Sequence, residues 1–223
     1  MSEPLPGALP DTLPDTLPDT LDIALVGVGG QGTILASNVL AELGMAAGYD
    51  VKKAEVHGMS QRGGSVVSHV RWGPEVFSPI IPAGGADILV AFEKMEAARY
   101  AALLAPGGTA IVNDFAIEPI TVITGGAHYP DDAAIEAAFA DGGHRLMWIH
   151  GARVAEELGN KFVANVVLLG ALSTLLGLPE AAWAAVLDRR VKAAHLEINH
   201  RAFAAGRAEM SAPAPTRPQP QTR

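Results

Sequence analysis

Short apolar runs alternate with longer amphipathic segments along most of the chain. Runs of strand length and β-branched composition predict strands at 22–27, 51–56, 65–72, 87–91, 109–113, 120–124 and 145–150. Segments with a helical period predict helices at 33–46, 93–104, 131–140, 151–158, 163–177, 179–191 and 195–209. Strands separated by crossover helices predict a Rossmann-like α/β fold with a mostly parallel sheet, helices on both faces and a helical C-terminal part.

The two ends of the chain break this pattern. Residues 9–20 repeat Leu-Pro-Asp-Thr three times, and a proline at every fourth position prevents helix formation and most strand pairing. We therefore expect residues 1–20 to be a disordered lead-in. Residues 211–223 are rich in Pro, Gln and Thr and are expected to be a second disordered tail. One domain remains at 21–210, and a hydrophobic content of 49% suffices for its core.

Composition narrows the possible functions. A net charge of −8 without a basic cluster disfavours a nucleic-acid partner. The chain contains no cysteine, which excludes thiolate-bound iron–sulfur clusters, a thiol nucleophile and disulfides. No signal peptide is recognisable, so a cytoplasmic location is expected. The apolar stretch 162–178 is short for a membrane span and is interrupted by polar residues, so we expect it to be buried in protein.

A glycine-rich turn joins the first predicted strand to the first predicted helix. Such a strand, turn and helix bind phosphate groups because glycines let the ligand reach the backbone N–H groups and the helix N-terminus. Thr33 stands where a nucleoside-triphosphate loop needs Lys, so that class is excluded. A packing turn without a ligand is the alternative. The predicted cofactor-binding residues here are Gly27, Gly29, Gly30, Gln31 and Gly32.

A second polar, glycine-flanked segment follows the second strand. Glu55 is near the place of the carboxylate of an NAD site, but it leads into a loop rather than ending the strand. An Arg in this loop can present its guanidinium to a carboxylate or phosphate, or else form an ion pair within the chain. The predicted cofactor-binding residues of this segment are Glu55, His57, Gly58, Met59, Ser60, Gln61, Arg62, Gly63 and Gly64.

Other polar residues are weaker candidates. Asn113 and Asp114 end a strand at the expected ligand edge, where they either touch a cofactor or cap the next segment. Asn165 and Asn199 interrupt apolar helix faces and are expected to be structural amides. The apolar helix 163–176 is expected to form a subunit interface, with burial in the core as the alternative. Histidines lack metal-ligand spacing, so no metal site is predicted on this chain. No thiol nucleophile or serine-hydrolase elbow is present either, and no catalytic residue is predicted on this chain.

The two glycine segments together resemble the gamma-type domain of the 2-oxoacid:ferredoxin oxidoreductases, most of all those that act on indolepyruvate. The string from Glu55 to Gly64 is the more specific part of the resemblance. Later segments fit as well, and the similarity spans about residues 22–207. The later segments that fit the family are Gly159-Asn160, Asn165-Val166-Val167-Leu168-Leu169-Gly170, Glu197-Ile198-Asn199 and Ala202-Phe203.

This resemblance implies a small subunit that works with a large one. The large alpha subunit would carry thiamine diphosphate, Mg²⁺ and 4Fe–4S clusters, in a heterotetramer or larger complex that passes electrons to ferredoxin or another acceptor. The complex would convert a 2-oxoacid and coenzyme A to an acyl-CoA and CO₂. The resemblance associates coenzyme A with this chain. A free-standing NAD(P)-dependent dehydrogenase and a scaffold subunit without ligand are the alternatives.

Overall fold

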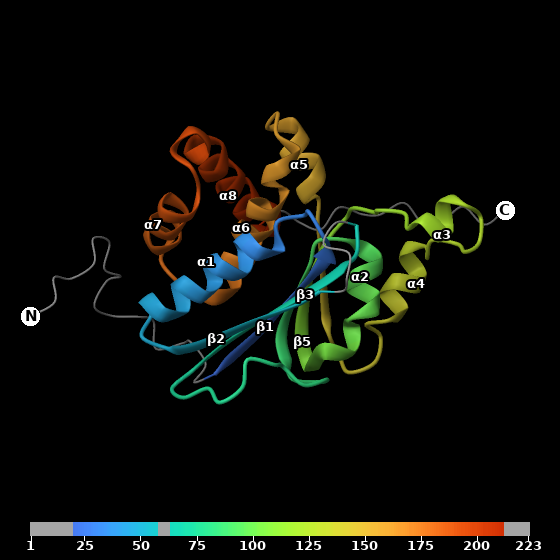
Figure 1. The fold of residues 1–223 in the computed structure, drawn as a ribbon, viewed down its shortest axis with the longest axis horizontal. Coiled ribbons are helices and arrows are strands. Elements are labelled where there is room, and N and C mark those ends of the chain that lie inside the picture. The colour runs from blue at the N-terminus through green and yellow to red at the C-terminus, as the bar shows by residue number, and fades with distance from the viewer. Residues whose placement is uncertain (1–19, 58–62, 212–223) are drawn as a thin grey trace, which may run out of the picture.

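The computed structural model describes residues 20–57 and 63–211, which form one six-stranded sheet covered by helices (Figure 1). The strand order is β2-β3-β1-β4-β5-β6. Strands β1, β4, β5 and β6 run parallel to one another. Strand β3 lies between β2 and β1 and runs antiparallel to both. The strands are β1 (Leu21–Val28), β2 (Asp50–His57), β3 (Ser65–Gly73), β4 (Ala86–Ala91), β5 (Leu104–Asn113) and β6 (Arg145–Ile149). The predicted fold class, a mostly parallel α/β sheet with a helical C-terminal part, is confirmed.

Helices cover both faces of this sheet, and the alternation of side chains along β1 shows how. Ile23 and Leu25 contribute to the core under α1 (Thr33–Ala46), α6 (Ala164–Leu176), α7 (Glu180–Arg190) and α8 (Leu196–Ser211). Ala24 and Val26 belong to the opposite core, under α2 (Lys94–Arg99) and α4 (Asp132–Ala137). Because both faces of β1 are buried, its sequence is a continuous apolar run. The remaining helices are α3 (Ile120–Ile123), α5 (Gly151–Glu157) and short 3-10 turns at Ala101–Leu103, Lys161–Val163 and Ala193–His195.

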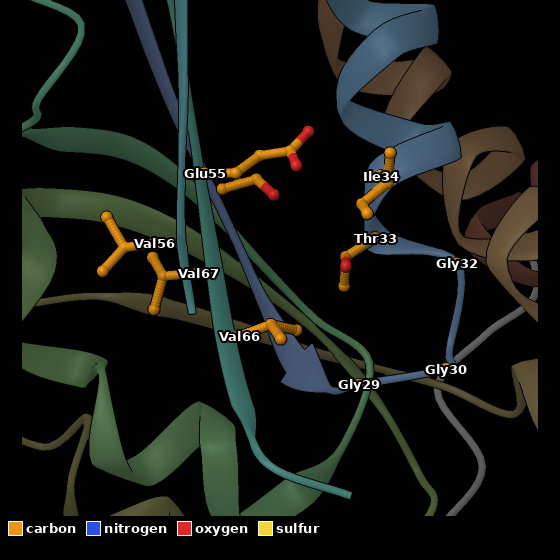
Figure 2. Close-up of a pocket in the computed structure, with 10 residues that line it drawn as sticks. Gly29, Gly30, Gly32, Thr33, Ile34, Glu55, Val56, Val66 and Val67 are labelled. Carbon is orange, nitrogen blue, oxygen red and sulfur yellow. The ribbon is translucent and has the colours of Figure 1, made fainter. Parts of the chain in front are cut away.

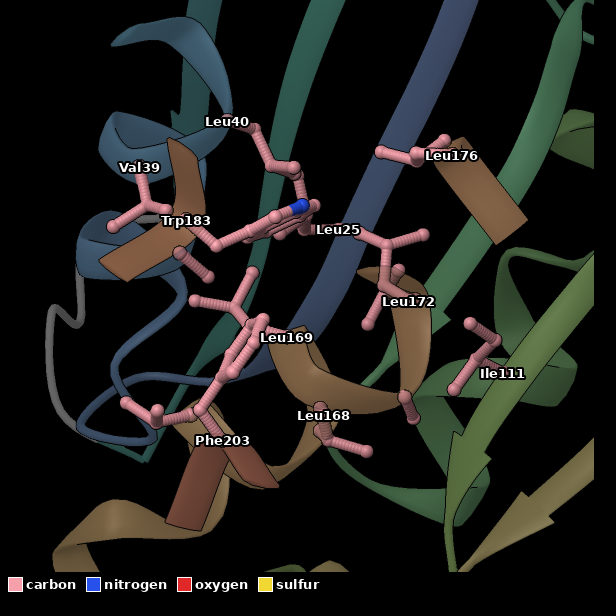
Figure 3. Close-up of a cluster of buried hydrophobic side chains, with 14 of the residues drawn as sticks. Leu25, Val39, Leu40, Ile111, Leu168, Leu169, Leu172, Leu176, Trp183 and Phe203 are labelled. Atoms are coloured by element: carbon pink, nitrogen blue, oxygen red, sulfur yellow. The ribbon is translucent and has the colours of Figure 1, made fainter. Parts of the chain in front are cut away.

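Helix α6 lies in the centre of the larger core rather than at a subunit interface. Ten of its 13 residues are buried within this chain, and Figure 3 shows Leu168, Leu169 and Leu172 between the sheet and the side chains of Trp183 and Phe203. The expectation of a subunit interface at 163–176 is therefore wrong, because α1, α7 and α8 already cover this helix. The alternative of core burial is confirmed.

Several predicted elements differ from the structure, among them the helix predicted at 131–140, which ends at Ala137. Residues 120–124 form the helical turn α3 instead of a strand, because no strand of the sheet lies beside this β-branched run to pair with it. The helix predicted at 93–104 ends at Arg99, followed by a 3-10 turn, and β5 begins at Leu104 rather than at 109. The predicted tails lie outside the described residues, except for Thr20 and for Ser211, which ends α8.

Among the described residues, no helix has both the length and the apolar character that crossing a bilayer requires.

Candidate functional site

The glycine turn lies at the edge of the sheet where the parallel strands end. Strand β1 ends at Val28, and α1 begins at Thr33 after the cap residue Gly32, whose φ of 84° favours glycine. The backbone N–H groups of Gly30, Gly32 and Thr33 have no hydrogen-bond partner among the described residues. Amides at the start of a 14-residue helix have the geometry and partial positive charge that suit an anionic group.

The side chain of Gln31 braces the turn. Its Oε1 accepts a hydrogen bond from the Val28 N–H at 2.7 Å, and its Nε2 donates to the Phe92 carbonyl at 2.9 Å. A Cβ on Gly27 would lie 2.9 Å from both the Gln31 Oε1 and the Phe92 Cβ. Gly27 and Gln31 therefore shape the turn within the protein, which leaves ligand contact to backbone atoms of the turn.

The two predicted glycine segments are joined by hydrogen bonds. The Gly29 N–H donates to the Gly64 carbonyl at 2.8 Å, and the Gly63 N–H donates to the Gly29 carbonyl at 3.2 Å. The structure thus brings Gly63 and Gly64 onto the turn. The predicted residues Gly58, Met59, Ser60, Gln61 and Arg62 lie outside the described residues, as does the side chain of His57.

A first cavity of about 450 Å³ opens between the turn and the sheet face beneath α1 (Figure 2). Gly29, Gly30 and Gly32 line it together with Thr33, and Glu55 points into it from β2. Glu55 pairs with Lys53 at 2.6 Å, and Lys53 also donates to Asn38 Oδ1 at 2.6 Å. The predicted residues Gly29, Gly30, Gly32 and Glu55 therefore share one cavity.

The place of Glu55 differs from that of the carboxylate in a dinucleotide site. In that fold the second strand is the parallel neighbour of β1, and its acidic residue reaches the ribose. Here β3 separates β2 from β1, which moves Glu55 about 5 Å farther away across the sheet. This sheet order speaks against the NAD(P)-dependent dehydrogenase considered from the sequence.

A second cavity, of about 410 Å³, lies on the other side of the turn. The described residues that line it are mainly apolar, and they include one acidic residue, Glu156, and one basic residue, Lys161. The Lys161 Nζ lies 5.5 Å from the ring centroid of Phe162. Phe162 is 75% exposed, so its ring is accessible at the mouth of this cavity. The sequence interpretation missed this cavity because its walls, Leu35, Phe92, Phe115, Phe162 and Ala164, come from four separate segments.

The amides near the second cavity are engaged within the protein. Asn113 donates to the Phe92 carbonyl at 3.1 Å and accepts from the Ala152 N–H at 3.2 Å, so it connects the ends of β4 and β5 to α5. Asn165 Nδ2 donates to the Gly32 carbonyl at 3.4 Å. Asp114 pairs with Lys94 at 3.1 Å. Asn113 and Asp114 lie at the end of β5, as predicted, and Asn165 is a structural amide of α6 that contacts the turn.

Two buried glutamates behind this edge were missed by the sequence interpretation. Glu93 is fully buried and accepts hydrogen bonds from the N–H groups of Glu96 and Ile117, at 2.9 and 3.0 Å, and from the Tyr129 hydroxyl. Burial, together with the hydrogen bond to Glu93, raises the pKa of Tyr129 above its ordinary value. Burial likewise raises the pKa of Glu96. Acidic residues three apart directly after a buried strand were the available signal.

The sequence of this chain is similar to those of known oxidoreductase subunits. The family model for pyruvate ferredoxin/flavodoxin oxidoreductase matches residues 22–209. Indolepyruvate oxidoreductase subunit IorB of Thermococcus kodakarensis is 40% identical over 188 residues, which cover 83% of this chain and 93% of that protein. The subunit of the same name from Methanothermobacter thermautotrophicus is 32% identical over 187 residues, covering 83% and 95%.

Solved structures show the same fold. The gamma subunit of a keto/oxoacid ferredoxin oxidoreductase from Geobacter sulfurreducens matches with a TM-score of 0.64 and 26% identity, covering 86% of this chain and 99% of that chain. A 2-oxoglutarate:ferredoxin oxidoreductase from Magnetococcus marinus, whose structure contains coenzyme A, matches with a TM-score of 0.67 and 23% identity. The match covers 88% of this chain and 32% of that longer chain.

Proposed function

The chain belongs to the pyruvate ferredoxin/flavodoxin oxidoreductase family, and from this premise we propose that it is the small subunit of an indolepyruvate oxidoreductase. The complex would oxidatively decarboxylate an arylpyruvate with coenzyme A to an acyl-CoA and CO₂. Identity of 40% to a subunit of that name, over 83% of this chain and 93% of that protein, is the observation that carries the proposal.

The reacting centre is proposed to lie on a large partner subunit. This chain has no cysteine to hold an iron–sulfur cluster, so the clusters are assigned to the partner. It also has no Gly-Asp-Gly to begin a thiamine diphosphate motif, so this cofactor and its Mg²⁺ are assigned to the partner as well. The thiamine cofactor supplies the carbon chemistry, and the clusters pass electrons to ferredoxin or another acceptor. We place the complex, a heterotetramer or larger, in the cytoplasm.

We propose that the role of this chain is to bind coenzyme A beside the active site of the partner subunit. Coenzyme A carries several phosphate groups, and the N–H groups of Gly30, Gly32 and Thr33, which no described residue accepts, supply donors for one of them at the N-terminus of α1. Arg62, next to Gly63, is proposed to add a charged donor. The net charge of −8 opposes an anionic ligand, so such local donors are needed.

The second cavity complements this anion site. A long cofactor with a flat base and an apolar arm needs an apolar wall beside its phosphates, and Phe115, Phe162 and Leu35 provide one next to the turn. Lys161 adds a positive charge at the same wall. The turn lies between both cavities, so a ligand bound to its amides can extend into either one.

The first test separates the share of each subunit. We expect this chain alone to show no oxoacid-dependent dye reduction, because neither a cluster ligand nor a thiamine diphosphate site is proposed on it. Adding the large subunit is expected to produce turnover that requires coenzyme A. Purified chain is assayed with arylpyruvate, coenzyme A and a redox dye, with and without the large subunit. Full turnover by this chain alone would end the proposal.

The second test concerns Arg62. Replacing it with Ala removes a charge-assisted hydrogen bond worth about 1.5–3 kcal/mol, so we expect the KM of the complex for coenzyme A to rise roughly 10- to 100-fold. The thermal midpoint should change little. Arg201→Ala is the matched control, because Arg201 is an exposed arginine on α8. Wild-type kinetics in Arg62→Ala would remove Arg62 from the site.

A further inference from the structure

Helix α2 supports the glycine turn from the face of the sheet opposite to α1. Two residues separate it from the end of β4, and it contributes Ala97 to the smaller core, which also contains Val26 of β1. Its Glu96 is only 2% exposed. A carboxylate in such a place needs hydrogen-bond donors, because an unpaired buried charge is very costly. The buried carboxylate of Glu96 therefore depends on neighbouring groups that donate hydrogen bonds to it.

Ser65 is the donor that connects Glu96 to the site. Its hydroxyl donates to Glu96 Oε2, while the other carboxylate oxygen, Oε1, lies 3.0 Å from the Arg99 guanidinium. The Ser65 hydroxyl also lies 3.1 Å from the Tyr100 hydroxyl, so α2 and the residue after it hold this serine at two points. Ser65 is the first residue of β3 and pairs in register with Val28, the last residue of β1.

The residue before Ser65 contacts the turn directly. The Gly64 carbonyl accepts the hydrogen bond from the Gly29 N–H, and the Gly63 N–H returns one to the Gly29 carbonyl. Glycines have no side chain to restrict their backbone, so the position of this pair depends on what anchors its neighbours. On the β3 side, Ser65 is anchored by its strand pairing with Val28 and, through its side chain, by the hydrogen bond to Glu96.

Glu96 is itself held by the end of β4. Its N–H donates to Glu93, which is fully buried, and the preceding residue Phe92 offers its carbonyl to Gln31 of the turn. Two paths of hydrogen bonds thus lead from residues 92–96 to the glycine turn. One reaches it through Gln31, and the other through Glu96, Ser65 and Gly64.

We propose that Ser65 and Glu96 are positioning residues that hold the glycine turn in the geometry needed to bind its anionic ligand. Neither residue lines the described cavities, so their effect passes through Gly64 and Gly29. The inference rests on the proposed function for the identity of the ligand, coenzyme A. Its structural part concerns this chain alone.

The test compares two serines that lose equivalent interactions. Ser65→Ala removes the hydroxyl bound to Glu96 and Tyr100. Ser173→Ala removes a buried hydroxyl in α6 that donates to the Gly170 carbonyl and accepts from Arg207, at 2.6 and 2.8 Å. Both variants are expected to lower the thermal midpoint. Only Ser65→Ala should speed hydrogen exchange of the Gly29 amide in the full chain.

Kinetics of the assembled complex complete the test. We expect Ser65→Ala and Glu96→Gln to raise the KM for coenzyme A about tenfold and about fivefold, with kcat within about twofold of wild type. Ser65→Thr keeps the hydroxyl and should keep the wild-type KM, as should Ser173→Ala. The inference is overturned if Ser65→Ala leaves the KM unchanged, or if Ser173→Ala raises it equally.

The proposed function fails in a different way. A wild-type complex whose turnover does not need coenzyme A would refute the role proposed for this chain. The exchange rate of the Gly29 amide would still report whether Ser65 positions the turn, because that measurement needs no ligand.

Discussion

Gly206→Ala is expected to destabilise the chain by about 3 kcal/mol or more, the upper end of what overpacking a core costs. Gly206 of α8 faces α6, and a Cβ at this position would overlap the backbone carbonyl of Val167. Gly170 of α6 stands in the same relation to the Phe203 carbonyl of α8. The two helices therefore cross with their backbones in contact, and a methyl group on either glycine forces them apart.

Equilibrium unfolding in urea measures this effect. Helix propensity alone favours Ala over Gly by about 1 kcal/mol, so a net loss in Gly206→Ala isolates the clash between the helices. Gly126→Ala is the control, because a Cβ at Gly126 meets its nearest atom at an ordinary 3.4 Å. We expect this control to stay within about 0.5 kcal/mol of wild type. An equally small change in Gly206→Ala would show that the helices cross less closely than described here.

Gly32→Ala is expected to have the largest effect on ligand binding. Gly32 has a φ of 84°, where an L-residue costs about 1–2 kcal/mol, and a Cβ there would overlap the side-chain amide of Asn165. The strained φ and the overlap together favour a shift of the turn or of the Asn165 side chain that donates to it, and a shift of the turn moves the N–H groups of Gly32 and Thr33. Losing one charge-assisted hydrogen bond to a phosphate should raise the KM for coenzyme A about tenfold or more.

The controls for Gly32→Ala separate backbone strain from the clash. Gly48→Ala carries the same strain, with a φ of 86°, but a Cβ there has no neighbour within 4 Å, and Gly48 lies beyond the far end of α1. It should lower stability without changing the KM. Adding Asn165→Ala to Gly32→Ala removes the overlap and should restore part of the lost stability. If Gly32→Ala and Gly48→Ala have the same kinetics, the turn does not bind the ligand.

The sequence predicted those strands and helices whose own residues show a clear hydrophobic or turn pattern. The apolar run of β1 and the glycines after it predicted a strand, a turn and a helix, and the structure has them at Leu21–Val28 and Thr33–Ala46. The segment 120–124 shows the limit of such signals. Its β-branched residues favour a strand, but a strand needs a partner, and α3 has none beside it.

The sequence predicted which two segments make up the candidate site, but it did not predict which contacts each of their side chains forms. The sequence predicted that the turn and the loop ending in Gly63-Gly64 work together, and the hydrogen bonds to Gly29 join them. It assigned Gln31 to a ligand, whereas the Gln31 amide bridges Val28 and Phe92. The ability of that amide to bind internally depends on a carbonyl 61 residues away.

The sequence by itself determined the local chemistry of this protein: the glycine turn, the absence of thiol ligands, the family motif and most strands and helices. These features depend on residues close together in the chain, so their pattern can be recognised without a structure. Only the tertiary structure decided that α6 is a core helix, that Asn165 packs on Gly32 and that Ser65 meets Glu96. Such contacts join residues 31 to 133 positions apart, and their geometry follows from how sheet and helices pack.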